Sequence, residues 1–230
     1  MKIYDVAFLG MGASALATAK LKYKGTSISL IGIDKNYHSK RNNFFAFWLT
    51  DWMKDFDSLA QKKWFCWNFY LTNNHIKHET KDLPYCTIRY QDWKNYCLKG
   101  LENLSIKEFN VQSITNLKKY YEIKLENGEE IFAKKIYDSR TPKLENEKVK
   151  QHFFGYLIET KQIINSNSVT LMDFRVEQKM GLHFMYCLPI DENRMLVEST
   201  VFSSEIQEDA WYQKQILEYI ETKLNLSEYK

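Results

Sequence analysis

The fold of this 230-residue chain can be predicted from its opening residues, Tyr4-Asp5-Val6-Ala7-Phe8-Leu9-Gly10-Met11-Gly12-Ala13-Ser14-Ala15. The apolar run at its start predicts a short strand, and the alanine- and leucine-rich residues that follow predict a helix ending near Gly25. A second apolar run, Ser27 to Ile33, predicts another strand, and Asp34 closes it. The opening residues therefore predict a compact β-α-β unit.

The turn between the first strand and the helix has the pattern G-x-G-x-x-A, with Gly10, Gly12 and Ala15 at the defined positions. In this pattern the first glycine permits a tight turn, the second lets the backbone approach a pyrophosphate, and the third small residue keeps helix and strand close. Asp34 is placed to accept hydrogen bonds from a ribose hydroxyl. The order of strand, glycines, helix, strand and acid predicts a dinucleotide site, but it does not choose between FAD and a nicotinamide cofactor.

Composition excludes several classes of protein. The 32 basic and 29 acidic residues leave a net charge of +3, which gives no case for a nucleic-acid binder. The mean hydropathy is −0.49, and no apolar run reaches the length of a spanning helix. Four cysteines lack metal-ligand spacing, which is typical of reduced thiols in a cytoplasmic protein.

The rest of the chain divides into a segment that is hard to interpret and a strand-rich segment. Residues 35–100 hold five of the six tryptophans and few clear strands, and Asp92 to Leu104 has helical spacing. Asn127-Gly128 predicts a hairpin between flanking strands. Further strands are expected at 153–160, 169–174, 182–188 and 195–202, and a final amphipathic helix at 206–224.

These elements predict an α/β fold: a Rossmann-like FAD/NAD(P)-binding domain with an associated, mostly antiparallel sheet. We expect one FAD-binding-type unit over 1–230. Within it, 1–40 and roughly 95–140 form the dinucleotide-binding part. Roughly 41–94 plus 150–205 form the substrate side.

Several ordered motifs carry a resemblance to a known family. They are Asn42-Asn43-Phe44-Phe45-Ala46-Phe47-Trp48, Tyr137-Asp138-Ser139-Arg140, Gln151-His152-Phe153-Phe154-Gly155-Tyr156, Leu171-Met172-Asp173-Phe174, Phe184-Met185-Tyr186-Cys187-Leu188-Pro189 and Leu196-Val197-Glu198-Ser199-Thr200. In this order and at this spacing the chain resembles bacterial, FAD-dependent lycopene β-cyclases over nearly its whole length. Thr141 and Phe45 depart from the family pattern, where glycine and tryptophan are expected.

The resemblance implies an isomerase of carotenoid biosynthesis that closes β-ionone rings at the acyclic ends of lycopene. Reduced FAD would serve without net redox change, and NAD(P)H would be its reductant. The resemblance also implies that Asp138 and Arg140 lie near the flavin and that Glu198 and Asp173 are catalytic. The aromatic segment 44–48 would line a polyene channel or form part of the core.

Glu198 is also the candidate acid or cation-stabilising group on physical grounds. In a strand it shares a face with Leu196, Thr200 and Phe202, and a carboxyl on an apolar face loses hydration, which favours its protonated form. The alternative is a strand facing water, with Glu198 a solvated charge. For Asp173 the alternative is a cap or an ion pair. The mechanism expected from the family sets an electron-rich isoalloxazine on the glycine turn, facing the protonated carboxyl of Glu198.

Members of the family continue beyond the helix at 206–224, so the resemblance implies a chain truncated at its C-terminus or completed by a partner chain. Because lycopene is insoluble in water, we expect a cytoplasmic protein associated peripherally with the membrane surface. The competing hypotheses are a flavin-dependent oxidoreductase of the hydroxylase or prenyl-reductase type, and a non-catalytic truncated subunit.

Overall fold

The structure is a computed structural model, and it describes residues 2–39, 43–141 and 148–230. Asn42, which begins the aromatic segment, lies outside the described residues. The chain forms two compact units: residues 1–45 with 89–142, and residues 46–88 with 143–230. Each unit is therefore assembled from two separate segments of the sequence, and each is described here by itself.

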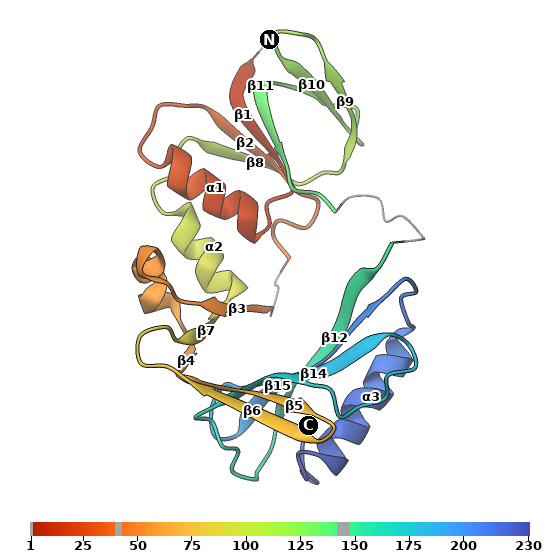
Figure 1. The fold of residues 1–230 in the computed structure, drawn as a ribbon. Helices are drawn as coiled ribbons and strands as arrows, with labels where there is room; N and C mark the ends of the chain where they lie inside the picture. Colours follow the sequence, from red (N-terminus) through yellow and green to blue (C-terminus); the bar gives the residue numbers. More distant parts are fainter. Residues whose placement is uncertain (1, 40–42, 142–147) are drawn as a thin grey trace. The chain divides into compact units, whose positions relative to one another are not determined.

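The first unit is built on a six-stranded sheet, which Figure 1 shows in full. Its strands, in spatial order, are β8 (Leu104–Lys107), β2 (Leu30–Ile33), β1 (Ile3–Leu9), β11 (Glu130–Asp138), β10 (Tyr121–Leu125) and β9 (Val111–Asn116). The strands from β8 to β11 run parallel, while β9, β10 and β11 form an antiparallel meander. The predicted β-α-β opening and the hairpin at Asn127-Gly128 are both present.

Two helices accompany this sheet. The helix α1 (Ala13–Tyr23) follows β1 directly and packs beside α2 (Tyr90–Leu98). On the face toward α1, Phe8 stacks on Tyr137 with ring centroids 5.2 Å apart. On the other face, alternate residues of the strands form an apolar cluster that includes Ala7, Leu9 and Ile31. Because side chains alternate along each strand, apolar residues cover both faces of the sheet.

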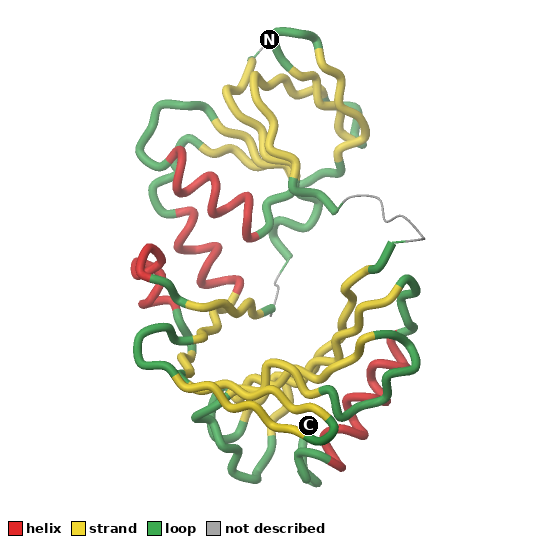
Figure 2. Tube along the Cα trace, viewed as in Figure 1, coloured by secondary structure: helices red, strands yellow, loops and turns green. Residues whose placement is uncertain are grey.

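The second unit also has a six-stranded sheet, mostly antiparallel and here called the larger sheet because the unit holds a three-stranded one as well (yellow strands in Figure 2). Its strands, in spatial order, are β12 (Lys150–Glu159), β15 (Arg194–Ser203), β14 (Leu182–Pro189), β13 (Val169–Asp173), β5 (Cys66–Leu71) and β6 (Asn74–Glu79). Only the β13–β5 pair among these described strands is parallel. Together with the mixed sheet of the first unit, whose strands β8 to β11 are parallel, this confirms the predicted fold class.

Helix α3 (Asp209–Thr222) covers one face of the larger sheet. It packs on β12 and β15, where Ile216, Tyr219 and Ile220 join buried residues such as Met185 and Val197. The other face is covered in part by a small sheet of β3 (Phe44–Trp48), β7 (Tyr85–Arg89) and β4 (Lys62–Trp64), with the 3₁₀ helix η1 (Asp51–Leu59) beside it in sequence. The two faces therefore have different partners.

The expectation of few strands between residues 35 and 100 is wrong, since β3 to β7 all lie there. β4 has only three residues and every residue of β6 is exposed, so these two strands carry no apolar pattern, whereas β3, β5 and β7 are short apolar or aromatic runs. The helix expected at 92–104 spans 90–98 instead. Gly100, at φ +82°, adopts a backbone conformation that ends a helix, and β8 begins at Leu104.

Candidate functional site

The glycine turn joins β1 to α1 at the carboxyl end of β1. Gly10 has φ +82°, the left-handed region that favours glycine, and a Cβ there would lie 3.2 Å from the Ser139 hydroxyl. Ser139 follows β11, and its amide donates to the Leu9 carbonyl over 2.9 Å. This hydrogen bond therefore joins the carboxyl ends of β1 and β11 beside the turn. Strand β2 lies on the other side of β1. In open α/β sheets, ligands bind where the strand order reverses in this way.

Gly12 provides the test of whether a nucleotide fits. Its φ of −74° and ψ of −173° suit any residue, and a Cβ built there meets no described atom within 4 Å. Neither backbone strain nor packing inside the protein therefore requires a glycine here. The missing side chain leaves open space beside the turn, here called the Gly12 cradle, which any larger residue would fill. No side chain caps the start of α1 in the described part of the chain, and its first turn holds no acid. Free N–H groups and a positive dipole end at an open cradle fit a pyrophosphate.

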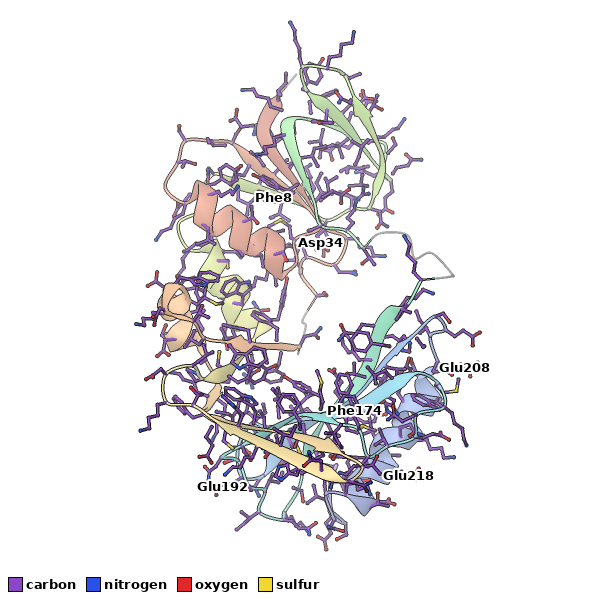
Figure 3. The ribbon with its side chains drawn as sticks, viewed as in Figure 1. Phe8, Asp34, Phe174, Glu192, Glu208 and Glu218 are labelled. Atoms are coloured by element: carbon purple, nitrogen blue, oxygen red, sulfur yellow. The ribbon has the colours of Figure 1, made fainter. Side chains whose placement is uncertain are left out.

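Asp34 lies beside the turn, as Figure 3 shows. Its carboxylate accepts hydrogen bonds from the amides of Met11 (2.9 Å) and Asn36 (2.8 Å). The acid predicted to bind a ribose therefore also holds the glycine turn in place. Ala15, the third position of the pattern, is buried against the sheet, with 3% of its surface exposed.

Asp138 and Arg140 lie at the end of β11, next to the same turn. Their side chains form a two-pronged ion pair, with Arg140 Nε 2.9 Å and Nη2 2.7 Å from the carboxylate oxygens of Asp138. The Arg140 hydrogen bonds lower the pKa of Asp138, so the carboxyl stays ionised. Both side chains are 40% exposed, which leaves one edge of the pair open to solvent.

Sequence reasoning missed Gly32 in the middle of β2. A Cβ there would lie 2.6 Å from Met11 Sδ and 2.8 Å from Ile106 Cδ1, so this glycine makes room for the Met11 side chain under the turn. The sequence does carry a signal for it, because a glycine inside an apolar strand often marks a place where another group approaches closely.

In the second unit, Glu198 lies in the middle of β15. Gly155 of β12 and Tyr186 of β14 are its direct neighbours across the sheet. The face of the sheet that carries Glu198 and Tyr186, here called the carboxyl face, is opposite to the face covered by α3. It is strongly apolar: Phe184 stacks near Phe202, and two flanking residues of β12 are exposed, Phe153 by 60% and Leu157 by 46%.

The environment of Glu198 favours its protonated form. Burial raises the pKa of the carboxyl, and a 2.8 Å hydrogen bond from the Thr200 hydroxyl works weakly against this. Among the described residues no lysine or arginine forms an ion pair with it. Gly155 keeps space beside it, since a Cβ there would lie 3.3 Å from Glu198 Cβ.

Two tyrosines near Glu198 were not predicted as site residues. The hydroxyls of Tyr85 and Tyr186 share a 2.6 Å hydrogen bond. Burial raises the pKa of each phenol, and the charge of Glu198 contributes in the same direction, so both remain neutral. Tyr85 also contacts Trp48, with ring centroids 4.8 Å apart. Tyr186 lies within the family motif, but only folding brings Tyr85 beside it.

Asp173 lies on the other face of the sheet. It pairs with Met185 across the strands and accepts a 2.7 Å hydrogen bond from Tyr219 of α3. Arg175 also holds it through two bonds of 2.9 and 2.6 Å. Burial acts to raise the pKa of this carboxyl, but these hydrogen bonds outweigh it and lower the pKa. Asp173 and Glu198 therefore do not face one another, and the contacts of Asp173 are those of a buried ion pair.

Two buried histidines have structural partners. His183 lies between the Ser199 hydroxyl (2.9 Å) and the Glu177 carbonyl (2.8 Å), and His152 contacts Ser203 and Tyr212. All four cysteines are free, and the described residues contain no cluster of potential metal ligands. Within the described ranges, no helix is both long and apolar enough to cross a membrane.

Comparison with known proteins places these features in context. A family model described as lycopene cyclase protein matches residues 5–229. No curated protein matches the sequence.

Among solved structures, the chain is similar to a geranylgeranyl bacteriochlorophyll reductase-like protein from Thermoplasma acidophilum (TM-score 0.70, 11% identity, 100% of this chain and 65% of that one). It is also similar to the flavin-dependent brominase Bmp2, with a TM-score of 0.61 and 14% identity over 96% of this chain and 62% of that one. A variant of the halogenase PltM in complex with FAD has a TM-score of 0.68 and 10% identity over 97% of this chain and 56% of that one. At these identities the likeness is one of fold, and the chain spans about three fifths of the length of these proteins.

Proposed function

We propose that this chain, which belongs to the lycopene cyclase family, binds FAD at its glycine turn and closes β-ionone rings at the acyclic ends of lycopene. The observation that carries the proposal is the state of Glu198: a partly buried carboxyl, without a cationic partner among the described residues, on an apolar sheet face. Protonation of an alkene needs an acid that is held neutral and kept from water. The surroundings of Glu198 provide both conditions.

The cofactor assignment rests on the first unit. The Gly12 cradle and the uncapped start of α1 suit the pyrophosphate, and Asp34 suits a ribose hydroxyl. Asp138 and Arg140, at the end of β11, would lie along the same ligand. Bound in its reduced form, the flavin would supply an electron-rich ring that stabilises positive charge.

The second unit would supply the proton. Glu198 donates its proton to the terminal C1=C2 double bond, the cation at C1 is attacked by the C5=C6 double bond, and a neighbouring proton leaves. The carboxylate formed in the first step is a base that can accept that proton, so the acid is regenerated with no net redox change. Thr200 orients the carboxyl through its 2.8 Å hydrogen bond.

The apolar carboxyl face would bind the polyene and exclude water. Phe184 is buried and contacts both Phe174 (5.5 Å) and Phe202 (6.3 Å), so it forms the floor of this surface. Phe153 and Leu157 offer exposed apolar area of the kind that a hydrocarbon chain covers. Burial of such area contributes about 25 cal/mol per Å². A water-insoluble substrate further favours work at a membrane surface.

Replacing the acid tests the proposal. In lycopene-accumulating bacteria, the native chain is expected to produce β-carotene, and Glu198→Gln is expected to lower ring formation by about 10²- to 10⁴-fold. Flavin absorbance should be unchanged, because Glu198 is not in the unit that carries the glycine turn. In vitro, ring formation should fall as pH rises through the raised pKa of Glu198, since the carboxyl loses its proton there.

Glu218→Gln is the matched control, because Glu218 is an exposed glutamate on α3 and should leave activity intact. Full turnover by Glu198→Gln would remove Glu198 from the role of acid. Persistent red pigment with the native chain would contradict cyclase activity. NAD(P)H-driven net oxidation or reduction would instead favour the flavin-dependent oxidoreductase.

A further inference from the structure

The carbonyl groups of the glycine turn are all held by protein donors. Ser139 Oγ lies 3.2 Å from the Leu9 carbonyl and 2.9 Å from that of Gly10. The Met11 carbonyl accepts from the Tyr90 hydroxyl (3.1 Å), and the Ala13 carbonyl accepts from Trp93 Nε1 (3.2 Å). The remaining carbonyl, that of Gly12, accepts the first helical hydrogen bond of α1, from the Leu16 amide.

The amides of the same turn divide into two groups. Those of Gly10 and Met11 are used within the protein, by the Ile33 carbonyl and the Asp34 carboxylate. For the amides from Gly12 to Ala15, the described part of the chain supplies no acceptor. The first N–H groups of a helix have no intrahelical acceptor, and here they lie beside carbonyls that are all paired, an arrangement that presents only donors to an anionic ligand.

The geometry of the peptide bond links the two groups. In a planar trans peptide the C=O of one residue points opposite to the N–H of the next. Holding the Met11 carbonyl therefore directs the Gly12 amide the other way, and holding the Ala13 carbonyl does the same for the Ser14 amide. The two donors, Tyr90 and Trp93, belong to the first turn of α2 and are 7% and 6% exposed.

We propose that Tyr90 and Trp93 are positioning residues for the cofactor's pyrophosphate, which fix the glycine turn with its carbonyls toward α2 and its amides toward the ligand. The inference rests on the proposed FAD site and deepens it. Without the Tyr90 donor the Met11 carbonyl, which precedes the helix, is free to rotate toward the phosphates, where its partial negative charge repels the ligand. The Ala13 carbonyl is also held by the helix, and the Trp93 donor adds a bond that fixes this first residue of α1 against α2. Ser139, which follows β11, holds the carbonyls at the start of the turn in the same way.

The test measures affinity for FAD, ADP and adenosine in the full chain, by quenching of flavin fluorescence and by competition. Tyr90→Phe keeps the ring and removes the donor, and Trp93→Phe replaces the indole with a smaller aromatic ring that has no donor. Each should weaken FAD and ADP about five- to tenfold, the equivalent of one hydrogen bond of about 1 kcal/mol. Adenosine, which lacks the pyrophosphate, should bind as to the native chain.

Tyr23→Phe is the control, because it removes a hydroxyl that bonds to Tyr137 in the same unit (3.1 Å) without touching the turn, and it should leave all three affinities unchanged. Unchanged FAD and ADP affinity in both α2 variants, or an equal loss for adenosine, would overturn the inference. If the α2 variants fail to fold, the exposed Ser139 provides the test. Ser139→Ala should lower the affinity for ADP but not for adenosine, and an ADP affinity equal to that of the native chain would count against the proposal. A native chain that binds no FAD would refute the cofactor assignment itself.

Discussion

Gly12 is the residue whose identity is explained least by the protein and most by a ligand. Gly10 is required by its positive φ, and Gly32 by its contact with Met11, but Gly12 has ordinary dihedral angles and open space at the Cβ position. Because the fold itself gives no steric reason for a glycine here, we explain Gly12 by the close approach of a bound ligand. This is the physical content of the second glycine in the dinucleotide pattern.

Gly12→Ala should therefore separate stability from binding. We expect its free energy of unfolding to stay within about 0.5 kcal/mol of the native value, since the methyl group meets no described atom. Its affinity for FAD should fall by about tenfold or more, because the methyl occupies the place of a phosphate oxygen. Urea unfolding and flavin fluorescence measure the two quantities. A loss of stability with binding retained would contradict this account of the turn.

At the scale of elements, the larger sheet separates the two carboxyls that the family motifs bring to attention. Register decides this: Glu198 pairs with Tyr186 on the carboxyl face, and Asp173 pairs with Met185 on the face under α3. The period of two in a strand assigns neighbouring residues to opposite sides, so motif spacing alone does not reveal which acids act together. Asp173 anchors α3 through Tyr219 and holds Arg175.

Asp173→Asn should act on stability. At neutral pH we expect a loss of about 3 kcal/mol, the lower end for breaking a buried ion pair, because the Arg175 side chain is 35% exposed and keeps some hydration. The lowered pKa of Asp173 gives the sign of the pH dependence: its stabilisation is present above the unfolded value of 3.8 and is lost as pH falls through the folded pKa. The difference between native chain and variant should thus shrink below about pH 4 in urea unfolding.

Asp191→Asn is the control for that comparison. Asp191 forms a similar ion pair with Arg194, but both side chains are more than 40% exposed, so its loss should cost about 1 kcal/mol or less. Ring formation should survive in folded Asp173→Asn. If the folded variant has the native stability but no activity, Asp173 acts in the chemistry after all.

At the scale of the whole molecule, each unit is completed by a later segment of the chain. The first unit takes α2 and the strands β8 to β11 from residues beyond 88, and the second takes β12 to α3 from residues beyond 142. The turn at residues 10–15 therefore depends on Tyr90, Trp93 and Ser139, which lie about 80 to 130 residues later in the sequence. Cofactor binding is expected to stabilise this long-range assembly.

Saturating FAD should raise the free energy of unfolding of the native chain. At a free concentration one hundred times Kd the gain is about 2.7 kcal/mol, because the cofactor binds only the folded turn. Thermal unfolding with and without FAD measures it, and hydrogen exchange should slow at residues 10–16. With a tenfold weaker affinity, Gly12→Ala should gain only about 1.4 kcal/mol at the same FAD concentration, and its hydrogen exchange should slow less. An equal shift in that variant would mean that FAD binds elsewhere.

Local pattern determined the opening β-α-β unit, the hairpin at Asn127-Gly128, the late strands, the fold class and the family, because each rests on short-range periodicity, turn chemistry or ordered motifs. The strands between residues 44 and 89 were not predicted, because β4 is very short, β6 is fully exposed, and short apolar runs such as those of β3 and β7 do not by themselves distinguish a strand from a buried helix segment. Only the tertiary structure decided that Glu198 and Asp173 face opposite ways, that Tyr85 joins Tyr186, and that Tyr90 and Trp93 hold the glycine turn. These depend on strand register and on contacts between distant segments, which are set by packing and leave no mark in the local sequence.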